Sequence, residues 1–403
     1  MRILFFTPYI GFNYGGISKA VEELASAIGK LDASVDVVTT DANNLEKISV
    51  PLKKWIDKKN YRIIYFPCWN RQDFVISLTL IIWLFQHIHE YDIVHCHTVF
   101  APIVLIVDWM CQYRHIPYVV TPHGMLEPWA LSYKARKKQV YYNLLEKAAL
   151  QNANAIHVIA SLEASNVRSL GFQQIVNVPN GIHRQEFEYL PEPEIFYQQF
   201  PITRNKNLIL FLGRIDPKKG LDLLAPAFAK VHDKFPQTHL VVAGPDNIGF
   251  MTTVQRYFRQ AQCLDAVSFT GMLTGNIKSA ALAAANLYVA PSYSEGFSMS
   301  VLEGMASGLP CVITDGCNFP EAAIAQAAYV VDINSDAIAD ALIHCLSHPQ
   351  QAKAMGDRAR EFIFQNYTWD RSAEKLVQVY QAIISRNSLT EYFTINSNSA
   401  SNG

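Results

Sequence analysis

Two glutamates separated by seven residues, Glu295 and Glu303, lie in the stretch Pro291–Pro310, PSYSEGFSMSVLEGMASGLP. An apolar run ends at Pro291, and Ser298–Ser307 is predicted to be a short helix that Gly308 stops. The N-terminus of such a helix offers free N–H groups to an anion. Glu303 could accept hydrogen bonds from a ribose diol, while Glu295 stays on the loop to face a second ligand group. Acidic residues at a helix start also complement the helix dipole, so this stretch alone leaves both interpretations open.

Two cations follow another predicted strand, Leu208–Leu212. Gly213 and Arg214 leave the strand end, and Lys219 lies at the start of the next expected helix. A guanidinium and an ammonium at one strand end suit a pyrophosphate. A lone exposed lysine is often only solvated, but the pair in front of the Glu295 loop favours an anion site.

A glycine pair lies in the first loop, Pro8–Ile17, where Gly15 and Gly16 separate the first strand from the first helix. Glycine lets the backbone approach a ligand closely, although a tight turn explains the pair equally well. The spacing does not match GxGxxG, and the sequence has no Walker-type GK[ST]. A dinucleotide site and a P-loop are therefore poorly supported.

One histidine, His123, stands between Pro122 and Gly124 directly after the predicted strand Tyr118–Thr121. That position predicts a side chain directed to a cleft rather than the core. His95 and His97 end another strand and share one face by alternation, so a metal pair is conceivable. With no third ligand evident, a mainly structural role or an acceptor-side role is expected for the pair.

Composition excludes several classes of protein. The chain has 403 residues, half of them apolar and 17% charged, with a formal net charge of −1, which gives no support to bulk nucleic-acid binding. The seven cysteines are scattered, without metal-site spacing, and are predicted to be reduced core residues of a cytoplasmic protein. No acidic cluster of the DxD type is present, and no metal site is predicted.

Alternating apolar runs and helical segments predict an α/β fold with parallel sheets. The first set of expected strands is Ile3–Thr7, Val35–Thr40, Ile63–Phe66, Ile93–Cys96, Tyr118–Thr121, Ala155–Ile159 and Ile175–Val178. The second set is Leu208–Leu212, Leu240–Ala243, Val267–Thr270, Leu287–Ala290, Cys311–Thr314 and Tyr329–Val331. The turn at Pro179-Asn180-Gly181 and the Pro/Glu-rich segment Leu190–Pro201 place the interdomain linker between the two sets.

Two further segments have surface properties. Phe74–Phe85 is the longest apolar stretch, too short to cross a bilayer, and is predicted to be a buried or interface-facing helix. Trp129–Leu150 carries Lys134, Arg136, Lys137, Lys138 and Lys147 among tyrosines. Such a segment is either a solvated helix face or one that rests on an anionic membrane.

Together these motifs resemble the retaining, nucleotide-sugar-dependent glycosyltransferases of family 4, which have the GT-B fold. The Glu295-x7-Glu303 spacing is similar to the family's EX7E signature, and Gly213 to Gly220 resembles its G-R-x4-K-G element. The resemblance covers about residues 1–380 and rests on the order of the glycine pair, His123, the two cations and the two glutamates. It departs at Gly304, where alanine is usual, at Ser298, where glycine or proline is common, and at Asp315–Asn318, which replaces a Gly-Gly turn.

The resemblance implies two Rossmann-like domains facing each other across a cleft. Residues 1–190 would bind the acceptor and residues 200–365 the donor, residues 366–385 would form a helix that packs back on the first domain, and residues 386–403 would be a disordered tail. The implied catalytic residues are Glu295, His123, Arg214 and Lys219. The implied donor-binding residues are Gly15, Gly16, Gly213, Arg214, Lys219, Gly244, Glu295, Gly296, Phe297, Ser298 and Glu303.

The implied reaction transfers a sugar from a nucleotide-diphosphate sugar, UDP or GDP type, to an acceptor hydroxyl with retention, without metal or cofactor. Arg214, Lys219 and the helix N-terminus would stabilise the leaving diphosphate. The implied partners are the donor and a glycan or lipid-linked acceptor in bacterial surface polysaccharide or glycolipid assembly, with peripheral contact at the inner face of the plasma membrane. The alternatives are a GT-B epimerase or phosphorylase, or a non-catalytic nucleotide-sugar-binding assembly partner.

Overall fold

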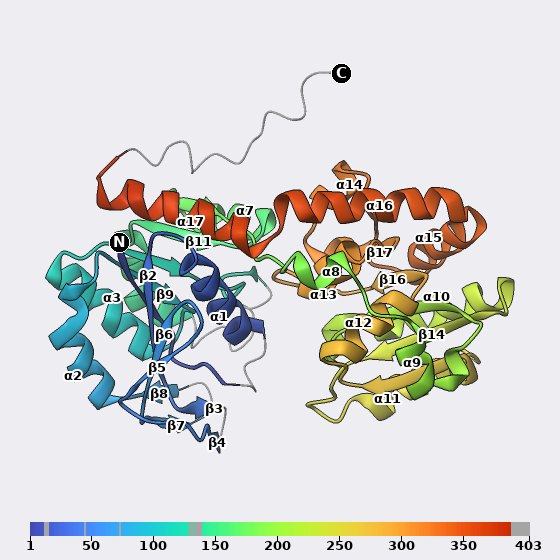
Figure 1. The fold of residues 1–403 in the computed structure, drawn as a ribbon, viewed down its shortest axis with the longest axis horizontal. Helices are drawn as coiled ribbons and strands as arrows, with labels where there is room; N and C mark the ends of the chain where they lie inside the picture. The colour runs from blue at the N-terminus through green and yellow to red at the C-terminus, as the bar shows by residue number, and fades with distance from the viewer. Residues whose placement is uncertain (12–15, 44–45, 72–73, 129–130, 132–138, 388–403) are drawn as a thin grey trace. The chain divides into compact units, whose positions relative to one another are not determined.

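The computed structural model describes residues 1–11, 16–43, 46–71, 74–128, 131 and 139–387 (Figure 1). The chain divides into two compact units. Unit 1 is Met1–Asn180 together with the chain from Trp369 onward, and unit 2 is Gly181–Thr368. Lys134–Lys138 and the predicted disordered tail from residue 388 lie outside the described residues.

Unit 1 contains an eight-stranded sheet in the order β12-β11-β10-β9-β1-β2-β6-β5, parallel except for the edge strand β5. Its strands are β1 (Arg2–Phe6), β2 (Ser34–Thr40), β5 (Trp55–Asp57), β6 (Arg62–Phe66), β9 (Ile93–His97), β10 (Tyr118–Thr121), β11 (Ala155–Val158) and β12 (Ile175–Asn177). Two small antiparallel pairs accompany it, β3 (Ala42–Asn43) with β4 (Glu46–Lys47) and β7 (Trp69–Arg71) with β8 (Phe74–Ile76). The strand order reverses between β1 and β9, so the carboxyl ends of these two strands mark a switch point.

The helices of unit 1 cover this sheet. They are α1 (Gly16–Ile28), α2 (Leu78–His87), α3 (Pro102–Arg114), a π-helical turn (Tyr142–Glu146), α6 (Lys147–Asn152), α7 (Ser161–Ser169) and α17 (Trp369–Ile384). The C-terminal helix α17 packs on α1, Lys30 forms an ion pair with Asp370 at 2.8 Å, and Tyr380 is fully buried. Helix α17 therefore completes the core of unit 1.

Unit 2 contains a six-stranded parallel sheet in the order β15-β14-β13-β16-β17-β18. Its strands are β13 (Asn207–Leu212), β14 (Thr238–Ala243), β15 (Val267–Gly271), β16 (Leu287–Ala290), β17 (Cys311–Thr314) and β18 (Tyr329–Val331). Its helices are α8 (Gln185–Glu188), α9 (Glu194–Gln199), α10 (Leu221–Lys234), α11 (Met251–Gln260), α12 (Gly275–Ala284), α13 (Met299–Ala306), α14 (Glu321–Ile324), α15 (Ser335–Ser347) and α16 (Pro349–Asn366). The order reverses between β13 and β16, which creates a second switch point.

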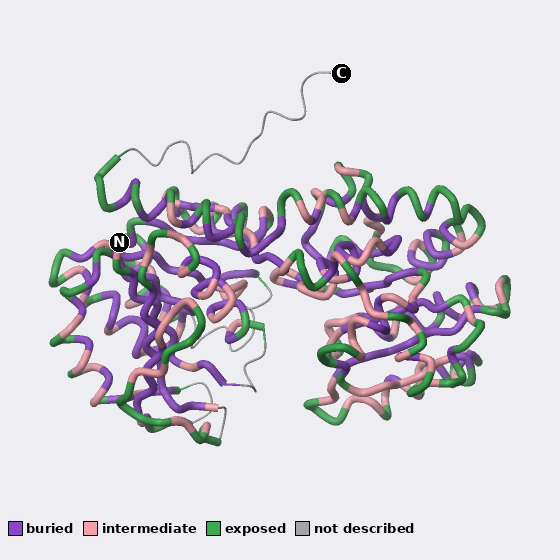
Figure 2. The backbone as a smooth tube through the Cα atoms, in the orientation of Figure 1, coloured by how far each residue is buried: buried purple, intermediate pink, exposed green. Residues whose placement is uncertain are grey.

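The predicted α/β architecture is confirmed, because every strand expected from the sequence is present within one or two residues. Continuous runs of valine, isoleucine and leucine form the central parallel strands, which are buried on both faces, whereas the edge strands β15 and β18 of unit 2 are partly buried (Figure 2). All seven cysteines are free and buried, as expected. In the described parts of the chain, no helix has the length and apolarity needed to cross a bilayer.

Two details differ from the sequence-based expectation. The apolar stretch from Phe74 begins as strand β8, and helix α2 starts only at Leu78, because the Ser77 hydroxyl caps it by accepting from the Leu80 N–H at 3.3 Å. The Pro/Glu-rich segment after Leu190 contains helix α9, whose Phe196 is buried where α9 packs on α12. The boundaries between the units fall at Asn180, within the turn Pro179-Asn180-Gly181, and again at Thr368.

Candidate active site

The residues predicted to bind an anion follow β13 and β16, the two strands that flank the switch point of unit 2. Gly213 and Arg214 leave β13, and the loop with Glu295 leaves β16. The carboxyl ends of parallel strands lie at one edge of a sheet, so these loops are neighbours. Gly220 fixes their approach, since it has φ +69° and a Cβ there would strike the Pro291 carbonyl oxygen.

Glu295 and Lys219 form an ion pair whose side chains are 8% and 12% exposed. The Ser292 hydroxyl donates to Glu295 Oε1 at 2.8 Å, and the Glu295 N–H donates to the Gly316 carbonyl at 2.8 Å. Glu295 therefore lies on its loop as expected, but its carboxylate is paired with Lys219, and its contact with a second ligand group stays a prediction. Its carboxylate is anchored to the cation expected to bind diphosphate, so a ligand phosphate would take Lys219 from Glu295.

Three cations lie near Glu295 and Asp216. Burial lowers the pKa of Lys218, Glu295 raises it, the neighbouring Lys219 and Arg214 lower it further, and Asp216 raises it slightly. The Arg214 side chain is exposed, and it has no carboxylate partner among the described residues. The excess of positive charge suits a dianionic group, and Lys218 is a cation that the sequence analysis did not assign to the site.

Glu303, on α13, forms a second ion pair with Lys278 of α12 at 2.8 Å. Their side chains are 13% and 22% exposed, so a ligand hydroxyl can still reach the carboxylate. Lys278 was missed by the sequence analysis. The available signal was that Lys278 is the one charged residue within Gly275–Ala284.

The N-terminus of α13 has no side-chain cap. Ser298 occupies the N-cap position, but its hydroxyl lies 3.2 Å from the Ser300 hydroxyl, which lies 2.9 Å from that of Tyr288. The first amides of this helix therefore have no side-chain acceptor and are suited to an anion. The predicted helix Ser298–Ser307 is thus one residue shorter at each end, as Met299–Ala306.

The departures from the family pattern have structural reasons. A Cβ on Gly304 would lie 2.7 Å from the ring of the fully buried Tyr288, so alanine does not fit there without a shift. In the turn Asp315–Asn318, the Asn318 side chain donates to the Glu295 carbonyl. A Cβ on Gly316 would strike the backbone of Ser292 and Tyr293. The altered turn therefore holds the Glu295 loop in place.

Gly213, Gly244 and Phe297, which were predicted to bind the donor, lie in contact with neighbouring loops or rings of unit 2. A Cβ on Gly244 would strike the Gly213 carbonyl, so the glycine at 244 allows the two loops to pack backbone against backbone. The ring of Phe297 contacts those of Phe319 and Tyr367, at centroid distances of 5.7 and 6.0 Å. Gly296 is partly exposed beside Glu295. Phe297 therefore supports the loop through packing.

His123 belongs to unit 1, where it follows β10 with φ +53°. Its Nε2 lies 3.1 Å from His97 Nδ1, and the N–H of Gly124 donates to Glu163 Oε1 at 2.6 Å. Burial lowers the pKa of His123 to about 3, with His157 as a smaller cause. His123 is consequently a neutral imidazole that keeps part of its surface accessible.

The conceivable metal pair His95 and His97 has a structural explanation. His95 Nδ1 lies 2.5 Å from the Tyr380 hydroxyl, and His95 Nε2 lies 2.6 Å from Thr121 Oγ1. Both ring nitrogens of His95 are occupied, so it cannot bind a metal. Across the described ranges, no group of three or more His, Cys, Asp or Glu residues could hold a metal ion.

The glycine pair of the first loop is described only in part. Gly16 begins α1, and a Cβ on it would meet nothing within 4 Å. Gly15 lies outside the described residues. The donor contact of both glycines stays a prediction.

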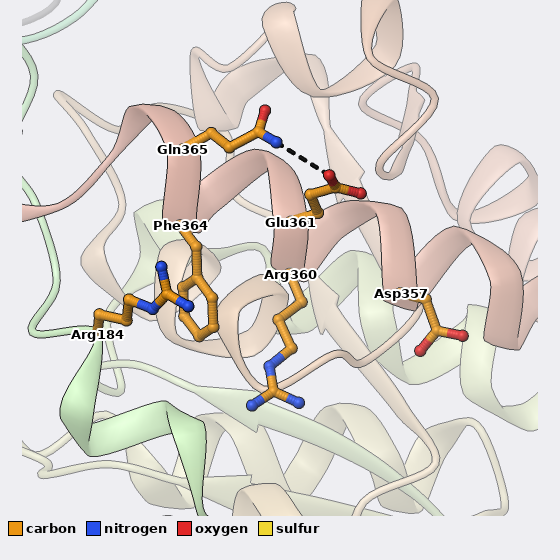
Figure 3. A pocket seen from close by; sticks show the side chains of 6 residues that line it. All are labelled: Arg184, Asp357, Arg360, Glu361, Phe364 and Gln365. Carbon is orange, nitrogen blue, oxygen red and sulfur yellow. Dashed lines mark hydrogen bonds between the residues drawn. The ribbon is translucent and has the colours of Figure 1, made fainter.

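A separate hollow of about 370 Å³ in unit 2 is not part of this site (Figure 3). It is lined by Arg184, Asp357, Arg360, Glu361, Phe364 and Gln365. Both arginines lie over the ring of Phe364, and Arg360 donates to the carbonyls of Phe187 and Glu188. The two arginines already have partners, because Arg184 pairs with Glu188 and Arg360 donates to backbone carbonyls. The hollow lies between α8 and α16.

Comparison with known proteins gives matches over nearly the whole chain. Residues 14–186 match the model of Glycosyltransferase Family 4, and residues 194–362 match that of Glycosyl transferases group 1. The D-inositol 3-phosphate glycosyltransferase of Corynebacterium urealyticum is 24% identical over 92% of this chain and 91% of its own length. The alpha-monoglucosyldiacylglycerol synthase of Streptococcus pneumoniae is 26% identical over 77% of this chain and 70% of its own length.

Solved structures agree in fold. Sucrose-phosphate synthase from Thermosynechococcus elongatus has a TM-score of 0.76 at 21% identity and covers 96% of this chain and 100% of its own. Anabaena HepE in complex with UDP-glucose has a TM-score of 0.72 at 17% identity and covers 95% of this chain and 100% of its own. The chain therefore belongs to the family 4 glycosyltransferases and has the GT-B fold of two Rossmann-like domains.

Proposed function

We propose that this glycosyltransferase moves a sugar from a nucleoside-diphosphate sugar to an acceptor hydroxyl with retention of anomeric configuration and without a metal ion. The observation that carries the proposal is the surplus of cations at the switch point of unit 2. Arg214, Lys218 and Lys219 lie among two carboxylates, those of Glu295 and Asp216, which leaves one positive charge in excess. A diphosphate leaving group needs positive charge of this kind as its bond to the sugar breaks.

The roles divide between the two ion pairs. The diphosphate takes Lys219 and the N-terminus of α13, and Glu295, released from Lys219, turns to the hydroxyls of the donor sugar. Glu303 accepts from the ribose diol. His123 contacts the transferred sugar as a neutral hydrogen-bonding group, because burial suppresses its protonation.

The donor is of the UDP or GDP type, and the acceptor is a glycan or lipid-linked molecule in bacterial surface polysaccharide or glycolipid assembly. A structural neighbour binds UDP-glucose, and a relative is named as a synthase of a glucosyl diacylglycerol, which supports both assignments. The proposed location is the cytoplasm, with peripheral contact at the inner face of the plasma membrane because a lipid-linked acceptor lies in the membrane.

A binding screen tests this proposal. Thermal stability is measured with UDP, GDP and ADP and with their sugars, each with and without EDTA. We expect one nucleoside diphosphate to raise the melting temperature, and we expect EDTA not to change this increase. Proton NMR of the product then reports the anomeric configuration. No response to any nucleotide, or an inverted product, would contradict the proposal.

Donor alone provides a control for an epimerase. A glycosyltransferase leaves the sugar configuration of its donor unchanged when no acceptor is present. Conversion of the donor to its epimer under these conditions would show that the enzyme is an epimerase and would contradict the proposed transfer.

A further inference from the structure

Two consecutive helices of unit 1 present apolar side chains to the outside. Leu78, Ile82 and Phe85 of α2 follow the spacing i, i+4, i+7 and are 71%, 58% and 48% exposed. Trp109 and Tyr113 of α3 are 45% and 73% exposed. These five residues are called the α2–α3 face.

The five side chains form one surface. Helices α2 and α3 pack against each other in unit 1 (Figure 1). The Arg114 guanidinium lies 4.5 Å from the ring centroid of Phe85 and 5.8 Å from that of Tyr113, so it bridges the two helices. The face is therefore continuous from one helix to the other.

Charged residues are scarce on these helices. The sequence of α2, LTLIIWLFQH, contains no Asp, Glu, Lys or Arg. In α3 the charged residues are Asp108, which is buried, and Arg114 at the last position. The solvent-facing side of a helix is normally polar, and an exposed apolar patch of this extent marks an interaction surface.

Basic residues flank the face. Trp55 of β5 contacts Trp83 of α2 edge to face at 5.8 Å, which places the segment Leu52–Lys59 beside α2. This segment carries four exposed lysines and one aspartate, and its lysines are Lys53, Lys54, Lys58 and Lys59. Arg114 adds a cation on the α3 side.

We propose that the α2–α3 face docks on the surface of an anionic lipid bilayer. Aromatic and aliphatic side chains enter the boundary between headgroups and acyl chains, and the lysines contact the anionic headgroups. A second copy of the chain fits less well, because the lysine segments of a symmetric pair would repel at the rim and protein interfaces are depleted in lysine. The inference rests on the membrane contact proposed above and assigns it to a surface other than the basic segment Lys134–Lys138.

Vesicle sedimentation of the full chain tests the proposal. We expect binding to phosphatidylcholine vesicles that contain phosphatidylglycerol and much weaker binding to phosphatidylcholine alone. The double variant Leu78→Gln with Ile82→Gln should weaken binding at least ~tenfold, because two large apolar side chains are removed from the buried area. The control pairs Ile202→Gln with Ile324→Gln, two exposed isoleucines of unit 2, and should bind like the parent.

Two further measurements distinguish the contribution of the basic residues to binding from the depth to which the face enters the bilayer. The triple variant Lys53→Gln, Lys54→Gln, Arg114→Gln should lose binding at low salt and differ little from the parent at high salt, where the charges are screened. Brominated acyl chains should quench part of the tryptophan fluorescence of the parent, and Trp109→Phe should reduce that quenching.

Three outcomes would overturn the proposal. The first is no binding to either vesicle. The second is binding that the variants of the α2–α3 face retain and that is lost only when glutamine replaces Lys134, Arg136, Lys137 and Lys138. The third is a stable dimer in light scattering that Ile82→Gln dissociates. Each variant is also titrated with UDP and GDP, so a failed membrane surface remains distinguishable from a failed nucleotide site.

Discussion

The two switch points of this enzyme differ in how their polar groups are held. At the β13–β16 edge of unit 2, the charged side chains form ion pairs that a ligand can exchange, Lys219 with Glu295 and Lys278 with Glu303. On β9, one of the two strands at the β1–β9 switch point of unit 1, His95 is held between Tyr380 and Thr121, and burial lowers its pKa well below the usual range. Unit 2 therefore offers charge to a ligand, whereas unit 1 offers neutral hydrogen-bonding groups on a rigid frame.

This contrast predicts the largest effect for Glu295→Gln. The neutral amide at position 295 cannot form an ion pair with Lys219. Its hydrogen bonds to the sugar hydroxyls also lack the charge that would strengthen them in the transition state. We expect kcat to fall by about 10²-fold, comparable to the loss of one charge-stabilising group. Nucleoside diphosphate affinity should not fall, since Lys219 loses a competing carboxylate.

Steady-state kinetics with product titration measure both quantities. Glu186→Gln, an exposed glutamate of unit 2, serves as the control. If Glu295→Gln loses diphosphate affinity while Glu303→Gln retains it, the assignments of the two glutamates are reversed.

The neutral frame of unit 1 predicts a pH dependence of stability. Burial raises the pKa of Asp108 to about 7 and that of Glu146 to about 8, with Asp108 adding to the shift of Glu146. A carboxyl whose folded-state pKa is raised contributes stability below its unfolded pKa and loses it as the pH rises through the folded value. Unit 1 should thus lose stability as the pH rises from about 4.5, the ordinary pKa of a glutamate, to about 8, the raised pKa of Glu146.

The buried histidines act in the opposite direction. Their folded-state pKa values are lowered, to about 3 for His123 and about 4 for His157, so they contribute stability above pH 6.5 and lose it on acidification. Thermal unfolding measured from about pH 3 to about pH 9 checks both arms. Glu146→Gln should flatten the alkaline arm, and an alkaline arm as steep as that of the parent would show that Glu146 is ionised in the folded protein.

A smaller effect is expected for Glu303→Gln. The ribose is distant from the breaking bond, so its contact contributes equally to ground-state and transition-state binding. Donor KM should rise about tenfold, the order of one hydrogen bond to a charged group, with kcat little changed. A loss of kcat at unchanged KM would place Glu303 at the reacting sugar instead.

No effect is expected from metal removal. The cations of unit 2 and the amides of α13 supply the positive charge for the leaving group, so activity should survive EDTA. Complete loss with EDTA, restored by Mg²⁺ or Mn²⁺, would show that these fixed charges are insufficient.

The sequence predicted the strands well, because their uninterrupted apolar runs leave few alternatives. It also predicted which residues leave the strand ends of unit 2. It did not predict the Lys219–Glu295 pair, since the two residues are 76 positions apart and only the sheet order brings them together. Lys278 was missed for the same reason. The sequence also offered no reason for glycine at position 304, which the structure explains by the buried ring of Tyr288 beside it.

The charged site of unit 2 is tested most directly by calorimetry of nucleoside diphosphate binding. Arg214→Ala and Lys219→Ala should each weaken the affinity by about 1.5–3 kcal/mol, roughly 10- to 150-fold, the range for hydrogen bonds to charged groups. Lys353→Ala, which removes an exposed lysine of α16, should bind like the parent. Unchanged affinity in both Arg214→Ala and Lys219→Ala would contradict the account, because the cations at the switch point would then not bind the diphosphate.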